Sequence, residues 1–237
     1  MNTNIDVRVT PSLHPDTVKA IEGYDDDTAP LLASTERAFR EAYTSVGLIY
    51  EARDKAANNP TWNESQVAIE TDNYAQKHLG KVCKTFDEAL TVVNKGIEHI
   101  ERELSSPLTS RASLSLASEI RAHVKGLPQD KRNALLTSKL SSKDDMTLSA
   151  VLGAPAFLSG LDDAMQAHLT RQYRETQEPV LAKRLKALTG AKALIEQRGG
   201  LVFKEIEKAV GMPPHKVTSL RQARTAAEQA LNFGRAS

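Results

Sequence analysis

Histidine, cysteine and paired carboxylates are the side chains of this 237-residue chain that could do chemistry, and their spacing argues against catalysis. None of the six histidines lies three residues after a glutamate, so the Glu-x-x-His pairs of di-iron helical bundles are missing. The HExxH motif, a phosphate-binding loop and a GxSxG nucleophile turn are missing from the sequence as well. We therefore predict no catalytic residue, no cofactor-binding residue and no small-molecule substrate.

Acidic clusters are the remaining candidates for a metal site. A calcium loop alternates its ligands and ends on a glutamate, and the consecutive aspartates at 25–27 lack that spacing. Carboxylates at positions expected to begin helices stabilise the helix dipole, which accounts for 25–27, 144–145 and 162–163. The cluster at 98–103 is typical of a solvated helix face. The sequence predicts no metal site.

The net charge of the whole chain is close to zero, but acidic and basic residues are unevenly distributed along it. Formal net charge is +1, but residues 1–110 carry 11 basic and 18 acidic side chains, whereas residues 171–237 carry 13 and 6. An acidic front and a basic tail indicate that the tail contacts either nucleic acid or the acidic part of a neighbouring subunit. A solvated basic helix face without a partner is the alternative.

The cysteine count, the first ten residues, the most apolar stretch and the composition indicate where the protein is located and which structural class it has. Cys83 is the only cysteine, so no disulfide framework exists and a reducing compartment fits. The first ten residues lack the basic and apolar regions of a signal peptide. The most apolar stretch, 148–161, is short and broken by Gly153 and Pro155, so we expect no membrane role and a cytoplasmic location. With 40% hydrophobic and 5% aromatic residues, the composition favours packed helices.

Two long apolar repeats predict an antiparallel helical hairpin, whose second helix has the clearest start signal in the chain. Asn63 and Gln66 stand three residues apart as in a capping box, and the repeat then continues to Leu104. Such a helix is about 60 Å long at 1.5 Å per residue, so we expect the hairpin either to project or to be covered by other chains. The predicted hairpin seam consists of Leu79, Val82, Phe86, Val93, Ile97 and Ile100.

Shorter helices follow, each bounded by Gly, Pro or capping residues. We expect them at about 110–125, 129–140 and 143–152, and a further helix to about Thr176 that Ser159 and Asp162 cap. The predicted divisions are an N-terminal arm and short helix (1–28), the hairpin (29–107), a short-helix subdomain (108–178) and a basic C-terminal region (179–237).

The C-terminal region contains two helical stretches, about 180–197 and 203–210, joined by a Gly-Gly turn. Gly211 then gives a second turn, and Pro213 and Pro214 open a third helix with Val217 and Leu220 as its core positions. This arrangement resembles a helix-turn-helix. Glu207 departs from that family, which places a small residue where the two helices cross. A plain three-helix unit with a solvated basic face is the alternative.

The resemblance implies a recognition helix that contacts DNA bases and phosphates, and hence a docking surface for nucleic acid or a neighbouring subunit. Arg221 and Arg224 would lie near the DNA backbone. The predicted docking surface consists of Lys183, Arg184, Lys186, His215, Lys216, Thr218, Ser219, Arg221, Gln222 and Arg224.

The middle segment around LPQDKRNALL and TLSAVLGAPAFLSGL resembles uncharacterised proteins encoded among bacteriophage structural genes. Together the patterns predict an all-α protein: a long N-terminal antiparallel hairpin, a bundle of short helices and a helix-turn-helix-like C-terminus. The favoured function is a non-catalytic structural or assembly protein in a multi-chain particle, such as a bacteriophage virion, built as a homo-oligomer or with other subunits. The alternative is a DNA-binding regulator that dimerises through the hairpin.

Overall fold

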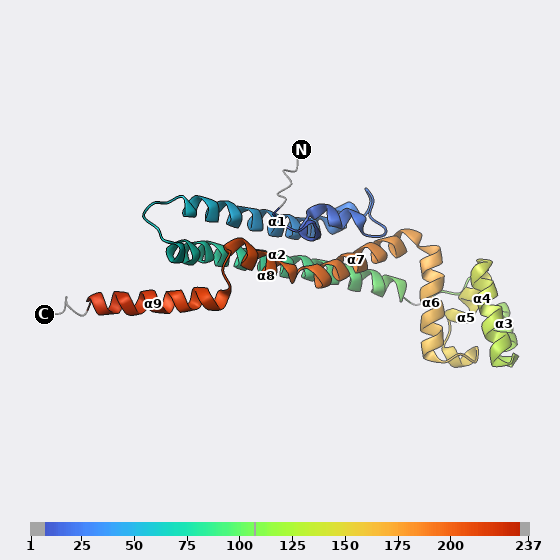
Figure 1. The fold of residues 1–237 in the computed structure, drawn as a ribbon. Helices are drawn as coiled ribbons and strands as arrows, with labels where there is room; N and C mark the ends of the chain where they lie inside the picture. Colours follow the sequence, from blue (N-terminus) through green and yellow to red (C-terminus); the bar gives the residue numbers. More distant parts are fainter. Residues whose placement is uncertain (1–7, 107, 233–237) are drawn as a thin grey trace. The chain divides into compact units, whose positions relative to one another are not determined.

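The computed structural model describes residues 8–106 and 108–232, and every regular element within those ranges is a helix (Figure 1). The predicted all-α class is therefore confirmed, with a long first pair of helices and shorter helices after it. The helices are α1 (Ala29–Ala57), α2 (Glu64–Leu104), α3 (Leu114–Gly126), α4 (Gln129–Ser141), α5 (Asp145–Leu152), α6 (Asp163–Gln177), α7 (Pro179–Arg198), α8 (Leu201–Val210) and α9 (Pro214–Asn232), with 3-10 helices at Pro11–Leu13, Pro15–Ala20 and Ala156–Leu158.

The chain forms two compact units rather than the four predicted divisions. Unit 1 contains the described residues up to Asn94 and from Ala187 onward, and unit 2 contains residues 95–186. Most of the helical hairpin and most of the basic C-terminal region, which we expected to be separate, thus share unit 1, while residues 95–106 and 179–186 belong to unit 2. The predicted boundary at residue 107 lies outside the described residues.

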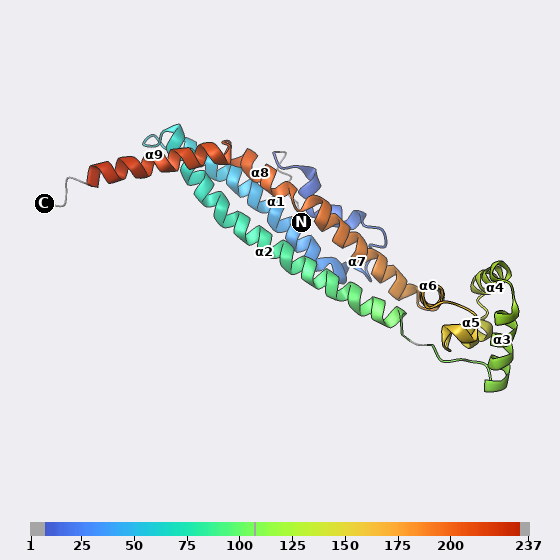
Figure 2. The same cartoon turned by 90° about the horizontal axis from the view of Figure 1, so that it is seen from below.

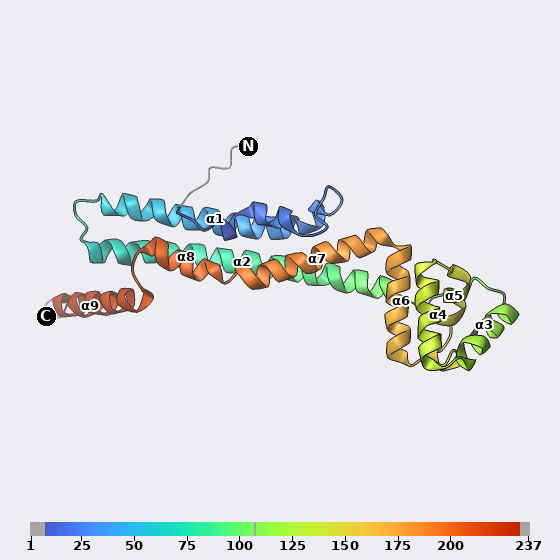
Figure 3. The ribbon, with the colours of Figure 1, turned by 45° about the vertical axis from the view of Figure 1, so that its right-hand side comes forward.

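In unit 1, α1 and α2 run antiparallel in a fixed register (Figure 3). Phe39 packs edge to face on Phe86, with ring centroids 5.2 Å apart. Glu41, two residues after Phe39 on α1, pairs with Lys81, five residues before Phe86 on α2, at 2.9 Å. The residue numbers rise along α1 as they fall along α2, so the two helices are antiparallel. Asn63 caps α2 as predicted, since its side-chain oxygen accepts from the Gln66 amide at 2.9 Å.

The predicted hairpin seam is buried at four of its six positions. Val82, Phe86, Val93 and Ile100 are buried, and Leu79 and Ile97 are half-buried. These residues recur every three or four positions, which places them on one side of α2.

Cover for α1 comes from the same chain, which corrects our expectation that the hairpin either projects or needs other chains. α8 packs along α1, and so do the 3-10 helices before it. The N-terminal segment also reaches the C-terminal helices: the Thr10 amide donates to Glu205 at 3.1 Å. Ile21 lies so close to Gly190 that a Cβ added at Gly190 would be 2.6 Å from the Cγ2 of Ile21. Segments distant in sequence therefore complete the core of unit 1.

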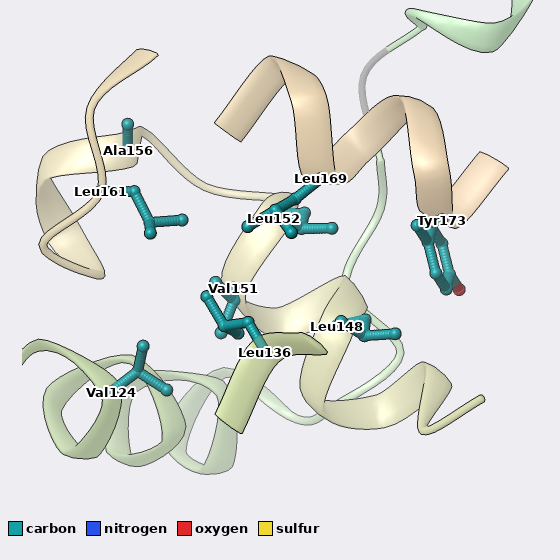
Figure 4. Packing of buried hydrophobic residues seen from close by; sticks show 9 residues of the cluster. All are labelled: Val124, Leu136, Leu148, Val151, Leu152, Ala156, Leu161, Leu169 and Tyr173. Carbon is teal, nitrogen blue, oxygen red and sulfur yellow. The ribbon is translucent and has the colours of Figure 1, made fainter. Parts of the chain in front are cut away.

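The core of unit 2 is an apolar cluster where α3, α4, α5 and α6 meet (Figure 4). α5 is the centre of this cluster, because Leu148, Val151 and Leu152 all point into it from one short helix. The remaining members come from the surrounding elements and are Val124, Leu136, Ala156, Leu161, Leu169 and Tyr173.

Capping side chains set the helix starts in unit 2 and correct two predictions made there. α3 begins at Leu114 rather than at residue 110, because Ser113 accepts from the Leu116 amide. α6 is capped by Asp162 alone, whose side chain accepts from the Met165 amide at 2.7 Å. Ser159 is fully buried in the preceding turn and does not cap. In unit 1, the short helix predicted within residues 1–28 is a 3-10 helix, Pro15–Ala20.

Asp144 caps α5 and carries a testable pH dependence. Its carboxylate accepts from the Thr147 amide at 3.0 Å and pairs with Lys139 at 2.8 Å. The hydrogen bond from Lys139, followed by that from Thr147, lowers the pKa of Asp144 from 3.8 to about 2. Because the folded-state pKa is the lower one, this carboxylate stabilises the fold above about pH 4, and that contribution is lost as pH falls from about 4 to 2.

We expect Asp144→Ala to lower the free energy of unfolding by about 1–2 kcal/mol at neutral pH, the range for a lost helix cap. Asp144→Asn keeps an oxygen for the cap and should remove this site's share of the acid dependence. Denaturant unfolding followed by circular dichroism at several pH values measures both effects. Asp130→Ala, at the exposed start of α4, is the matched control. Equal stability of the Asp144→Ala and Asp130→Ala variants would contradict the assignment.

Candidate interaction surface

The ten residues of the predicted docking surface are divided between the two units. Lys183, Arg184 and Lys186 on α7 belong to unit 2, and the seven on α9 belong to unit 1. Lys183 and Arg184 are half-buried. The α9 group is therefore described by itself.

Gly211 and two prolines position α9. Gly211 has φ +78°, a left-handed conformation that favours glycine, and its amide donates to the Glu207 carbonyl at 3.1 Å to close α8. Pro214 is the first residue of α9, and the Pro213 carbonyl accepts from the Val217 amide at 3.2 Å. The turn and the helix start expected from the sequence are both confirmed.

Arg53 on α1 anchors the same turn. Its guanidinium donates to the Ala209 carbonyl at 3.2 Å and lies against Gly211, where any added Cβ would clash with it. The end of α8 thus receives a cationic side chain, which is favourable at a helix C-terminus. Sequence reasoning missed Arg53, because an arginine 158 positions before the turn has no local pattern that links it to Gly211.

Two arginines join α9 to the first turns of α2. Arg221 donates to Asp72 and to the side-chain oxygen of Asn73, both at 2.6 Å. Arg224 pairs with Glu70 at 3.1 Å. We call Glu70, Asp72 and Asn73 the acidic seat.

A hydrogen bond within α2 orders part of the acidic seat. The side-chain amide of Asn73 donates to Glu70 at 2.9 Å, and this bond, together with the one from Arg224 of α9, lowers the pKa of Glu70 against the opposing effect of burial. Asp72 is largely buried, with 16% of its side chain exposed, whereas Arg221 keeps 37% exposed. Glu70 therefore presents an ionised carboxylate to α9 at neutral pH.

These contacts change what the predicted docking surface can offer to DNA. Arg221 and Arg224, predicted to lie near a DNA backbone, instead face carboxylates of their own chain. The hydroxyls of Thr218 and Ser219 donate to backbone carbonyls within α9, at 2.9 and 3.1 Å. His215, Lys216 and Gln222 remain exposed.

The relation of α9 to α8 also differs from a helix-turn-helix crossing. α9 leads onward from the end of α8 instead of turning back across it, as two perpendicular views show (Figures 1 and 2). Val217 is buried as predicted, but Leu220 is only half-buried, and Glu207 is exposed. The left-handed turn at Gly211 aims α9 away from α8, so Glu207 is not pressed between two helices.

Beyond Arg221, every described side chain of α9 is exposed. We call residues 222–231 the C-terminal arm. All ten are exposed, including Leu231 at 79%. Leu220, Ala227 and Leu231 follow each other at helical spacing, with Arg224 and Glu228 on the same side of α9. Arg224 pairs with Glu228 and with Glu70, whereas the apolar side chains of Ala227 and Leu231 are exposed.

Other candidate sites are weaker. No three His, Cys, Asp or Glu side chains within residues 8–106 and 108–232 are grouped so that they could hold a metal ion. Asp25 instead accepts from the Asp27 and Thr28 amides at 3.1 Å. Across those same ranges, no helix is long and apolar enough to cross a membrane. A cavity of about 370 Å³ in unit 2 has no charged side chain in its lining, which is Ser105, Leu108, Leu152, Gly153, Ala154, Pro155, Gln166, Ala167 and Thr170.

Comparison of the chain with protein-family models, with curated proteins and with solved structures finds no match in any of the three. Functional inference therefore rests on the geometry of α9, its acidic seat and its exposed arm.

Proposed function

We propose that the protein is a non-catalytic structural or assembly protein that acts in a multi-chain particle and contacts other chains through the C-terminal arm. The observation that carries this proposal is a helical segment, residues 222–231, in which every side chain is exposed and only Arg224 contacts the acidic seat. Isolated helices of this length are marginal in water, and most helices in proteins owe their stability to a packed apolar side. A projecting helix with an uncovered apolar side is therefore suited to a protein partner.

The concrete version of the proposal is a bacteriophage virion or assembly component, which draws on the resemblance of the middle segment to proteins from phage structural genes. The protein would then act in the cytoplasm or in the virion, as a homo-oligomer or beside other subunits. The closely packed hairpin of unit 1 would serve as a rigid support that holds the arm away from the body.

Charge placed on the apolar side of the arm tests this proposal. We expect Ala227→Glu with Leu231→Glu to convert an oligomer into a 25.9 kDa monomer in light scattering after gel filtration. Gln222→Glu with Gln229→Glu adds the same charge to the opposite side of the arm and should leave the mass unchanged. Both variants should remain helical by circular dichroism, because these side chains are exposed. If the first variant stays oligomeric, or if the control variant dissociates as well, the proposed role of the arm is wrong.

A DNA-binding regulator is the second candidate, and the exposure of His215, Lys216 and Gln222 favours it. Such a protein should bind duplex DNA with a steep dependence on salt. Lys216→Glu with Arg221→Glu should then abolish binding. Arg221 is already paired with Asp72, so this candidate also requires α9 to leave the acidic seat. Absence of duplex binding at low salt would eliminate it.

A further inference from the structure

The contact between α9 and the acidic seat joins two surfaces that a second copy of this chain also carries. Arg221 lies 149 residues from Asp72, and Arg224 lies 154 residues from Glu70. Nothing in these side-chain contacts depends on the two surfaces belonging to one molecule. Exchange of an identical element between copies keeps every such contact and needs no new complementary surface.

The connection before α9 is short and has one flexible point. Residues 211–213 link α8 to α9, and Gly211 is the only one of the three that adopts left-handed and extended conformations with equal ease. Pro213 and Pro214 fix their own φ angles, so a change at Gly211 moves α9 as a rigid rod. Short linkers of this kind favour exchange between copies over bending back onto the same body.

Few contacts retain α9 on its own body. Val217 is the one α9 side chain in residues 214–231 that is buried. The ion pairs at Arg221 and Arg224 are partly exposed, with 37% and 44% of the arginine side chains accessible, and partly exposed pairs are weak. Detachment of α9 breaks the contacts of Val217, Arg221 and Arg224, whereas the ring contact between Phe39 and Phe86 at the centre of the hairpin involves α1 and α2 alone.

We propose that two copies of this chain exchange α9, so that Arg221 and Arg224 of each copy occupy the acidic seat of the other. The inference rests on the proposed function, since it names a second copy of this chain as the partner that the C-terminal arm meets. Exchange seats the C-terminal arm of each molecule on the body of the other copy, with the contacts of Arg221 and Arg224 unchanged. It also unites the basic tail of one molecule with the acidic front of the other.

Charge reversal on separate molecules tests the exchange. An arm-reversed chain carries Arg221→Glu with Arg224→Glu, and a seat-reversed chain carries Glu70→Arg with Asp72→Arg. In either variant alone, the arm and the seat carry charges of the same sign, both within one molecule and between two copies. Neither variant can then exchange α9, so each should have a mass of 25.9 kDa by light scattering. Mixed one to one, opposite charges meet only between molecules, at both seats, and we expect a species of twice that mass. A chain with all four substitutions restores the pairs and should match the wild type.

The outcomes distinguish exchange from the broader proposal. If the four-fold variant matches the wild type but the mixture contains only monomers, the arginines act within one molecule and exchange is overturned. The proposed function still stands in that case when the wild type is oligomeric and Ala227→Glu with Leu231→Glu dissociates it. If circular dichroism shows either double variant unfolded, Arg221→Glu and Asp72→Arg as single reversals replace them, with the same expected dimer in the mixture and the same contrary result.

Discussion

Replacing Arg132 by alanine is expected to lower the free energy of unfolding of unit 2 by about 3 kcal/mol or more. Its guanidinium donates to the carbonyls of Val124, Lys125 and Leu127 at 2.9–3.1 Å and also to the Gly160 carbonyl. These bonds close the end of α3 and hold the turn before α6. Hydrogen bonds from a charged donor contribute about 1.5–3 kcal/mol each and are not additive, so the loss exceeds one such bond.

Denaturant unfolding of the full chain measures this effect, with the neighbouring exposed Lys131→Ala as the control. We expect the control to lie within about 0.5 kcal/mol of the wild type. Arg132→Lys should fall between the two, because one ammonium group cannot reach several carbonyls in the fork geometry of a guanidinium. Near-identical midpoints for Arg132→Ala and Lys131→Ala would show that the contacts do not stabilise unit 2.

Truncation of Phe39 in unit 1 is the second change for which we expect a large loss of unfolding free energy. Phe39 is fully buried between the helices of the hairpin and meets the Phe86 ring edge to face. Phe39→Ala removes most of that side chain and leaves a cavity at the centre of the register, for which the expected cost is about 3–5 kcal/mol. Thermal and denaturant unfolding monitored at 222 nm measures it.

Two further variants separate packing from the mere loss of an aromatic side chain. Phe39→Leu fills much of the space and should cost clearly less than the alanine variant. Phe203→Ala removes the same side chain from α8, where 56% of it is exposed, and should cost about 1 kcal/mol or less. A Phe39→Ala cost no greater than that of Phe203→Ala is incompatible with the described hairpin core.

Local signals in the sequence were sufficient to predict the hairpin and the turns. Asn63 with Gln66 marks the start of α2, and the capping hydrogen bond is present. Gly211 was expected in a turn because it stands at the turn position of the helix-turn-helix pattern, and its φ is +78°, a conformation that glycine adopts readily. These features depend on residues within one or two helical turns of each other, which a single sequence displays directly.

Contacts of long cationic side chains could not be predicted in the same way. Arg53 on Gly211, Arg132 on the end of α3, and Arg221 on the acidic seat each join distant or unrelated positions. The uneven charge of the chain indicated that the basic tail contacts nucleic acid or the acidic part of a neighbouring subunit. It did not reveal that Glu70 and Asp72 of the same sequence supply them, because charge counts contain no distances.

The division of the chain into two units could not be predicted from local sequence patterns either. Hydrophobic periodicity placed a stripe on α2, and it did not indicate which segment covers α1. In the structure α8 and the 3-10 helices before α1 do so. The packing of α8 on α1 joins segments far apart in the sequence. The apolar spacing of a short helix such as α8 does not show which other helix it packs against.

The mass of the full-length protein over a wide range of concentrations tests the central claim, that the C-terminal arm joins this chain to others. Sedimentation equilibrium of the wild type is the direct measurement. The account predicts a mass of at least twice 25.9 kDa at high concentration, and a shift to 25.9 kDa for Ala227→Glu with Leu231→Glu. A wild type that remains a 25.9 kDa monomer at every concentration would contradict it.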